Sequence, residues 1–124
     1  AHSPSKLKAT TYAIKKQYPN RSLIACLELH TFSSLNKKFL KEYSNSMSDA
    51  DTAIIYYNPN TIKHKKMKSI SKDFIQLSFN RKDILVFTKS NKLISYLNSI
   101  SWKNKTLLMM SSGNFDGIII EELI

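Results

Sequence analysis

The residues best suited to bind a ligand lie near the end of the chain, in the stretch LLMMSSGNFDGI, residues 107–118. An apolar run leads there into serine and asparagine side chains, and both glycines of the chain, Gly113 and Gly117, fall in the same stretch. Glycine permits a sharp turn and a close approach of the backbone to another molecule. Free backbone N–H groups at the start of a following helix would favour an anion such as a carboxylate. A plain strand-to-helix turn is the alternative, and these residues alone leave both interpretations open.

A second polar stretch, Glu-Leu-His-Thr-Phe-Ser-Ser at residues 28–34, also follows an apolar run. A carboxylate such as that of Glu28 needs water or a partner near the end of a buried strand, so it could meet a ligand ammonium or a lysine of the protein. A lone histidine such as His30 is more often structural than catalytic. A third polar stretch, residues 57–60, follows another apolar run.

Several kinds of active site are missing from the sequence. It contains no glycine-rich phosphate loop of the P-loop type and no second histidine or cysteine at metal-ligand spacing. It also contains no evident set of nucleophile, base and orienting residue. The lone cysteine, Cys26, sits in an apolar run, which is typical of a small buried hydrophobe rather than of a nucleophile. We therefore expect the binding half of a site and not a complete active site.

The spacing of apolar residues predicts the elements that position these stretches. A first helix begins with Ser3 as its N-cap and Pro4 in its first turn, and it ends at Pro19. Its expected buried face repeats every three or four residues and consists of Leu7, Thr11, Ile14 and Tyr18. The opposite face carries Lys8, Lys15 and Lys16.

Extended and helical patterns alternate along the rest of the chain. Short apolar runs predict strands at 23–27, 53–57, 84–87 and 107–110. Spaced apolar residues predict helices at 32–43, 71–79, 93–100 and 117–124, while residues 60–70 carry no clear pattern. This alternation predicts an α/β, Rossmann-like three-layer domain, with a mainly parallel sheet and helices on both faces. Ligands of such sheets bind beyond the carboxyl ends of the strands, and this rule selects the three polar stretches.

Length and charge limit the classes of function. The 124 residues suit one domain, and no apolar run approaches the roughly 20 residues that span a bilayer. The net charge of +10 can attract polyanions, so a basic nucleic-acid-binding module is a rival interpretation. Against it, only Arg21 and Arg81 are arginines, and the densest basic cluster, residues 63–68, is expected to be a solvated surface. A doubly wound regulatory or partner-binding domain is a further alternative.

Three stretches resemble the C-terminal domain of the Mur ligase family. The opening residues AHSPSKLKATTYAIKKQYPN match the Ala/Gly-His-x-Pro signature and amphipathic helix with which that domain begins. MSDADTAIIYYNP resembles the family's Ser/Ala-Asp-Ala-Asp segment, and LLMMSSGNFDGI resembles the Ser-x-Gly-x-Phe-Gly-Gly loop of the family's murein peptide ligase branch. Residues 60–105 match only by pattern. Residues 1–124 are therefore expected to be one C-terminal, acceptor-binding domain, a fragment of a longer three-domain enzyme.

The resemblance implies an ATP-dependent ligase of peptidoglycan synthesis or recycling that joins a peptide to UDP-N-acetylmuramate. In the family, the other two domains hold the UDP-sugar and ATP with Mg²⁺, and the incoming amine attacks an acyl phosphate. The resemblance further implies a cytoplasmic enzyme without a membrane or nucleic-acid partner, whose other domains are the partners of this chain. His2 and Ser3 would lie near the nucleotide. No residue of the chain is expected to be catalytic or a metal ligand, and the chain alone should be inactive.

The resemblance also implies an acceptor pocket at the ends of the first and last strands. Its expected residues are His30, Thr31, Ser33, Ser112, Gly113, Asn114 and Phe115. The L-alanine-adding branch has arginines where this chain has Thr31 and Ser34, so the carboxylate of a free amino acid would lose its clamp. This difference favours a murein tripeptide as the acceptor. A UDP-N-acetylmuramate–L-alanine ligase is the alternative, because the peptide branch usually has an arginine at position 30 and a glycine at 116.

Overall fold

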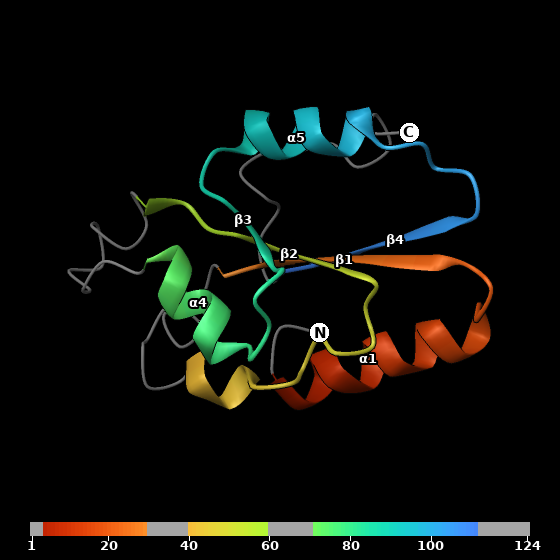
Figure 1. The fold of residues 1–124 in the computed structure, drawn as a ribbon, viewed down its shortest axis with the longest axis horizontal. Coiled ribbons are helices and arrows are strands. Elements are labelled where there is room, and N and C mark those ends of the chain that lie inside the picture. Colours follow the sequence, from red (N-terminus) through yellow and green to blue (C-terminus); the bar gives the residue numbers. More distant parts are fainter. Residues whose placement is uncertain (1–3, 30–39, 60–70, 112–124) are drawn as a thin grey trace.

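The computed structural model describes residues 4–29, 40–59 and 71–111, whose strands form a single parallel sheet (Figure 1). Every pair of neighbouring strands is parallel, and the order across the sheet is β3-β2-β1-β4. Along the chain the elements are α1 Pro4–Gln17, β1 Ser22–Glu28, the 3-10 helix η1 Lys41–Tyr43, β2 Thr52–Tyr56, α4 Lys72–Ser78, β3 Leu85–Phe87, α5 Ser90–Ser99 and β4 Lys105–Met110. The predicted α/β class with a parallel sheet is confirmed.

Helices cover both faces of the sheet, which gives the expected three layers. Figure 1 shows α1, η1 and α4 on one side of the strands and α5 on the other. Side chains of a strand alternate between the two faces, so β1 contributes to both cores. Leu23, Ala25 and Leu27 pack in the core beneath α1 and α4, whereas Ile24 and Cys26 pack in the core beneath α5. β1 and β2 are therefore buried on both faces, as their continuous apolar runs predicted, whereas the edge strands β3 and β4 are mostly half-buried.

The first helix buries the face that its spacing predicted, except at its end. Leu7 and Thr11 are fully buried, and the Thr11 hydroxyl donates a hydrogen bond to the Leu7 carbonyl at 3.0 Å. The prediction for Tyr18 is wrong, because α1 ends at Gln17 and the Tyr18 side chain is 39% exposed. Its ring instead stacks with the Arg21 guanidinium, whose carbon lies 5.2 Å from the ring centroid.

The second helix is confirmed only in its last part. Residues 40–43 end in the 3-10 helix η1, and 32–39 lie outside the described residues, as does the helix predicted at 117–124. Tyr43 of η1 stacks on Phe79, just beyond α4, with ring centroids 5.0 Å apart. The strands β1 and β4 begin earlier than predicted, since the backbone N–H of Ser22 donates to the Asn104 carbonyl at 3.0 Å.

The order of the strands reverses between β1 and β4. The chain moves outward from β1 to β2 and then to β3, and α5 then carries it back across the opposite face to β4. β1 and β4 therefore lie side by side although they are far apart in the chain. Open α/β sheets bind their ligands in the crevice at such a reversal.

Candidate ligand-binding edge

The candidate site is the carboxyl edge of the sheet where β1 and β4 lie side by side. Their register pairs Cys26 with Met109 and Leu27 with Met110, so the next opposed residues are Glu28 and Ser111. Two of the three polar stretches selected from the sequence therefore start at neighbouring strand ends. The third starts next to them, because β2 pairs with β1 on its other side and brings Tyr56 opposite Glu28.

Glu28 and Ser111 interact directly across this edge. The Ser111 hydroxyl donates a short hydrogen bond to Oε1 of Glu28, over a separation of 83 residues in the chain. Glu28 is buried, with only 2% of its surface exposed, whereas Ser111 is half-buried. A buried carboxyl group needs such partners, because desolvation without them is unfavourable. The expectation that Glu28 has a partner is confirmed, and one partner is a hydroxyl.

Four residues of different chemistry form a row across the sheet at this level. Phe87 of β3 is opposite Tyr56 of β2, which is opposite Glu28, and Ser111 follows β4. Strand alternation puts this row on the α5 side, where Tyr56 and Phe87 pack in the core beneath α5. Phe87 also packs against Tyr96 of α5, with ring centroids 5.5 Å apart. The edge thus passes from aromatic at β3 to polar at the β1–β4 reversal.

Cys26 lies two residues before Glu28 on the same face and is fully buried. Burial, and then the negative charge of Glu28, raise the pKa of its thiol well above the ordinary value. A thiol needs a lowered pKa to act as a nucleophile near neutral pH. The interpretation of Cys26 as a small buried hydrophobe is confirmed.

All seven residues of the expected pocket lie outside the described part of the chain. These are His30, Thr31, Ser33, Ser112, Gly113, Asn114 and Phe115, together with the nucleotide-proximal His2 and Ser3. The basic cluster at 63–68 also lies outside it. Of the third stretch, Tyr57 is described: it is buried, and its backbone N–H donates to the Phe87 carbonyl at 3.1 Å. The described residues therefore show where the first and last of the three polar stretches begin and not how their side chains are arranged.

The described residues offer no metal site. Within 4–29, 40–59 and 71–111, no three histidine, cysteine, aspartate or glutamate side chains gather closely enough to hold an ion. The same residues contain no helix long and apolar enough to cross a bilayer. Glu28 stands at the strand ends with a hydroxyl partner and not with a second carboxylate. These residues do not fit Mg²⁺, so we assign no chemical step to a metal on them.

Two surface hollows lie on the described part of the chain. One of about 590 Å³ is lined by residues of α4 and the turn that follows it, including Leu77 and Arg81. The other, of about 340 Å³, lies beside the start of α1 and is lined by Pro4, Lys8 and Glu42 among others. Neither is lined by residues of the candidate edge, so the hollows and the strand reversal are separate features.

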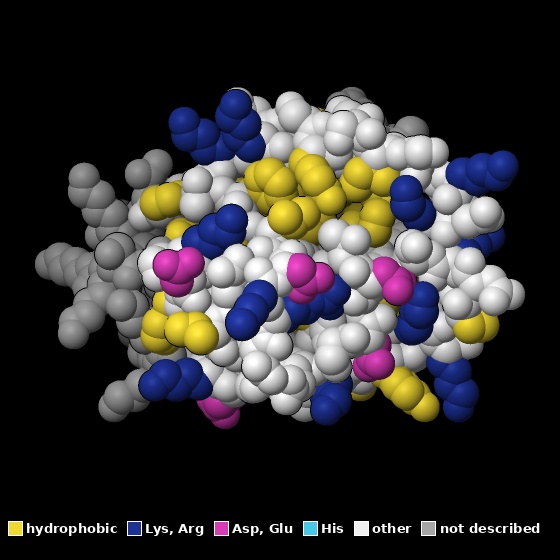
Figure 2. Space-filling model, viewed as in Figure 1, with side chains coloured by type: hydrophobic (Ala, Val, Ile, Leu, Met, Phe, Trp, Pro, Cys, Tyr) yellow, Lys and Arg dark blue, Asp and Glu magenta, His cyan; other side chains and the backbone are white. Residues whose placement is uncertain are grey.

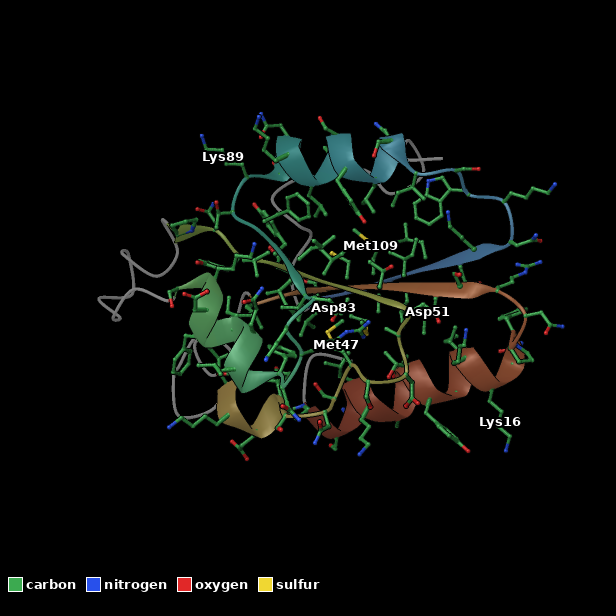
Figure 3. All side chains as sticks on the ribbon, in the orientation of Figure 1. Lys16, Met47, Asp51, Asp83, Lys89 and Met109 are labelled. Atoms are coloured by element: carbon green, nitrogen blue, oxygen red, sulfur yellow. The ribbon has the colours of Figure 1, made fainter. Side chains whose placement is uncertain are left out.

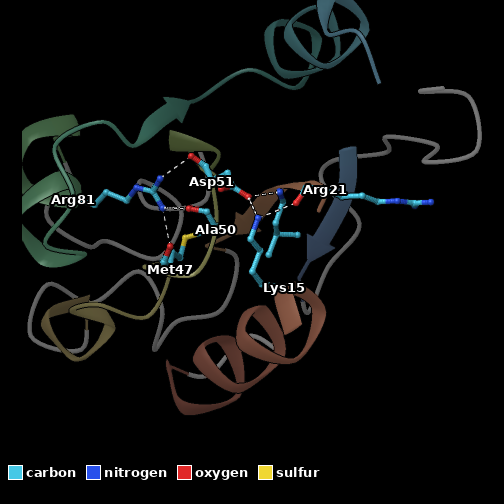
Figure 4. Close-up of polar contacts among 7 residues, drawn as sticks. Lys15, Arg21, Met47, Ala50, Asp51 and Arg81 are labelled. Atoms are coloured by element: carbon cyan, nitrogen blue, oxygen red, sulfur yellow. Dashed lines mark hydrogen bonds and ion pairs between the residues drawn. The ribbon is translucent and has the colours of Figure 1, made fainter. Parts of the chain in front are cut away.

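Sequence reasoning missed a polar network around Asp51, just before β2 (Figure 4). The Asp51 carboxylate accepts from the Leu23 backbone N–H at 2.6 Å and from Lys15 Nζ at 2.7 Å. The Arg81 guanidinium donates to the Met47 and Ala50 carbonyls at 2.7 and 2.6 Å, and to the Asp51 carbonyl at 2.9 Å. Figure 3 shows Met47 and Asp51 between the sheet and the helices on the α1 side, while Lys16 points outward.

This network ties together the beginnings of β1 and β2. Lys15 also donates to the Arg21 carbonyl at 2.8 Å, so it does not simply face solvent as its helix position predicted. Burial by itself would raise the pKa of Asp51. The hydrogen bonds from Lys15 and Leu23 and the charges of Lys15 and Arg81 outweigh it, so that the pKa lies below its ordinary value. The only hint in the sequence was the Ser-Asp-Ala-Asp segment, here Ser48 to Asp51.

Known proteins resemble this chain in both sequence and fold. The chain is 31% identical over 116 residues to a UDP-N-acetylmuramate–L-alanine ligase of Caldanaerobacter subterraneus subsp. tengcongensis. That alignment covers 92% of this chain and 25% of the relative, so the chain spans about a quarter of that protein. No protein-family profile matches the chain. It is a homologue of part of a Mur ligase.

Solved structures of Mur ligase domains have the same fold. One is a domain assigned to a UDP-N-acetylmuramate:L-alanyl-γ-D-glutamyl-meso-diaminopimelate ligase of Haemophilus ducreyi. It has a TM-score of 0.65 and 21% identity, over 94% of this chain and 77% of that one. The other is a UDP-N-acetylmuramate–alanine ligase of Thermotoga maritima, with a TM-score of 0.63 and 16% identity, over 94% of this chain and 23% of that one. The resemblance to Mur ligases that the sequence motifs indicated is thus confirmed.

Proposed function

We propose that this Mur ligase homologue is the C-terminal, acceptor-binding domain of a longer ATP-dependent ligase, which joins a peptide to UDP-N-acetylmuramate in peptidoglycan synthesis or recycling. The observation that carries the proposal is the reversal of strand order between β1 and β4. Both acceptor stretches continue from that reversal, where a ligand crevice is expected. The names of the relatives support the UDP-N-acetylmuramate substrate. The isolated domain would bind an acceptor without catalysing its ligation.

In this proposal the chain binds and orients the incoming amine. Ser112 and Asn114 hydrogen-bond a carboxylate of the acceptor, Phe115 packs on its peptide, and His30, Thr31, Ser33 and Gly113 complete the pocket. The amine attacks the acyl phosphate of the muramyl carboxylate, so that an amide bond forms and phosphate leaves. Holding the amine close to the carbonyl carbon in the orientation needed for attack lowers the entropic part of the activation free energy of amide formation.

The remainder of the enzyme supplies ATP and Mg²⁺ in this proposal, with His2 and Ser3 close to the nucleotide. The intact enzyme would be cytoplasmic, where ATP and UDP-sugars are available, and its other domains would be the partners of this chain.

The acceptor is tested by comparing a murein tripeptide with L-alanine, using the full-length enzyme, ATP and UDP-N-acetylmuramate, and measuring phosphate release. We expect a kcat/KM at least about a hundredfold higher for the tripeptide, equal to about 2.7 kcal/mol of transition-state stabilisation. A preference for L-alanine would make the chain an L-alanine ligase domain, the function named for the 31% identical relative. Phosphate release by the 124-residue chain alone would contradict the assignment to a binding domain.

A further inference from the structure

The Glu28–Ser111 pair lies where the backbone ladder between β1 and β4 ends. The last paired residues are Leu27 and Met110, and the side-chain hydrogen bond joins the residues one step further on. Beyond it the chain continues directly into residues 30–34 on one side and 112–115 on the other. The pair is therefore a side-chain link between the starting points of two stretches that are 83 residues apart in the chain.

Packing alone does not explain an acidic residue at position 28. All other residues from Leu23 to Leu29 are apolar and buried, and a buried carboxyl group is less favourable there than an apolar side chain of similar volume. With 2% of its surface exposed, Glu28 is also poorly placed to meet a ligand from solvent. These two facts favour a role exerted through Ser111 and against both a packing role and direct ligand contact.

We infer that Glu28 and Ser111 are positioning residues for the acceptor, because their hydrogen bond holds the two strand ends at a fixed separation. The inference rests on the proposed function and adds to it a specificity device outside the pocket residues. An acceptor that touches both stretches binds well only when their starting points are in register. The pair should therefore affect acceptor binding and leave the nucleotide and UDP-sugar unaffected.

Steady-state kinetics of the full-length enzyme test this inference with Glu28→Ala, Ser111→Ala and the double variant. Each single variant should raise the KM of the acceptor roughly tenfold, the size expected for loss of one hydrogen bond to a carboxylate. The kcat and the KM values of ATP and UDP-N-acetylmuramate should change less than about twofold. The double variant should be no worse than the single ones, because both remove the same link.

Two further variants separate positioning from other effects. In Glu28→Gln the amide oxygen still accepts from Ser111, so the acceptor KM should return most of the way to the wild-type value. Lys15→Ala removes a hydrogen bond to another carboxylate, that of Asp51, away from the candidate edge, and should leave the acceptor KM unchanged. Urea unfolding of every variant checks that the domain remains folded.

Three outcomes would overturn the inference while leaving the proposed function intact. One is a normal acceptor KM in Ser111→Ala beside a raised KM in Glu28→Ala. A second is effects that multiply in the double variant, since independent residues would then be involved. The third is an equal rise of KM in Lys15→Ala. A wild-type enzyme that uses neither the tripeptide nor L-alanine would instead remove the proposed function, and the inference with it.

Discussion

Arg81 links segments on the α1 side of the sheet, and we expect its replacement to destabilise the fold. Its guanidinium, with 17% of the side chain exposed, bonds three backbone carbonyls and the Asp83 carboxylate. The guanidinium offers five donors in one plane, which the lysine ammonium cannot reproduce. We expect Arg81→Lys to lower the free energy of unfolding by about 2 kcal/mol, measured by urea denaturation of the chain.

Arg21→Lys is the matched control for that prediction. Arg21 is exposed, and its guanidinium contacts the ring of Tyr18. Exposed substitutions of this kind change the free energy of unfolding by about 0.5 kcal/mol or less. Equal effects of the two substitutions would show that the carbonyl contacts of Arg81 contribute little to folding.

Asp51 makes the stability of the domain depend on pH at the acidic end. Its contacts with Lys15 and Leu23 lower its pKa in the folded state, so the unfolded chain takes up the proton first as the pH falls. The stabilisation is complete above the unfolded pKa of about 3.9 and is lost as the pH falls through the lower folded value. Urea unfolding between about pH 6 and pH 3 should therefore show a steeper loss of stability in the wild type than in Asp51→Asn. Parallel curves would contradict this assignment.

Sequence reasoning found Glu28 and the Ser111 stretch but not Asp51 or Arg81, for a physical reason. The polar ends of buried strands can be recognised along the chain, since a carboxylate after an apolar run has few explanations. Arg81 is important because it reaches carbonyls about 30 residues away in the sequence, at Ala50 and Met47. Contacts of that range depend on how elements pack, which neither spacing nor composition reveals.

At the level of elements, α5 alone among the described helices covers its face of the sheet (Figure 1). Leu93 and Leu97 of α5 are fully buried in the core between this helix and the sheet. Near the end of the helix, Trp102 Nε1 donates to the Leu97 carbonyl at 3.0 Å. We expect Leu97→Ala to lower the free energy of unfolding by about 3 kcal/mol, because it leaves a cavity in that core. Chemical denaturation followed by circular dichroism measures the effect.

The same substitution at Leu77 is the control. Leu77 lies in α4 with 79% of its surface exposed, so Leu77→Ala removes little buried area. It should change the free energy of unfolding by about 0.5 kcal/mol or less. A loss as large as that of Leu97→Ala would mean that the difference in burial between the two leucines does not govern their effect on stability.

The four strands and the helices α1, α4 and α5 were predicted with their types and near their bounds, whereas the order of the strands in the sheet was not. Periodicity identifies a buried strand or a helix face because it depends on neighbours a few residues apart. Strand order depends on which face each helix covers, and both faces of these strands are apolar. The sequence therefore could not show that β4 lies beside β1 and not beside β3, although this choice brings Glu28 and Ser111 together.

At the scale of the whole molecule, the chain has a net charge of +10. The basic side chains that the figures show are spread over the surface. Figure 2 shows lysines and arginines scattered among acidic side chains over the face in view, and Figure 3 shows Lys16 and Lys89 pointing outward on opposite sides of the molecule. Both arginines make internal contacts, Arg81 with backbone carbonyls and Arg21 with the Tyr18 ring. Among the described residues on the face in view, basic and acidic side chains are interspersed, which favours weak attraction to polyanions.

The dispersed charge leads to a prediction that separates the ligase domain from the nucleic-acid-binding rival. Fluorescence anisotropy should give the chain a Kd for a single-stranded 20-mer weaker than about 10 µM at 0.15 M salt, as is usual for non-specific binding. Polyglutamate of similar length, which has the charge but no bases to stack, should compete about equally well. Stacking on aromatic side chains adds about 1–3 kcal/mol per base, so a true single-strand-binding protein would resist that competitor. Sub-micromolar binding that persists at 0.3 M salt and in polyglutamate would favour the rival, because neither scattered lysines nor a peptide pocket accounts for it.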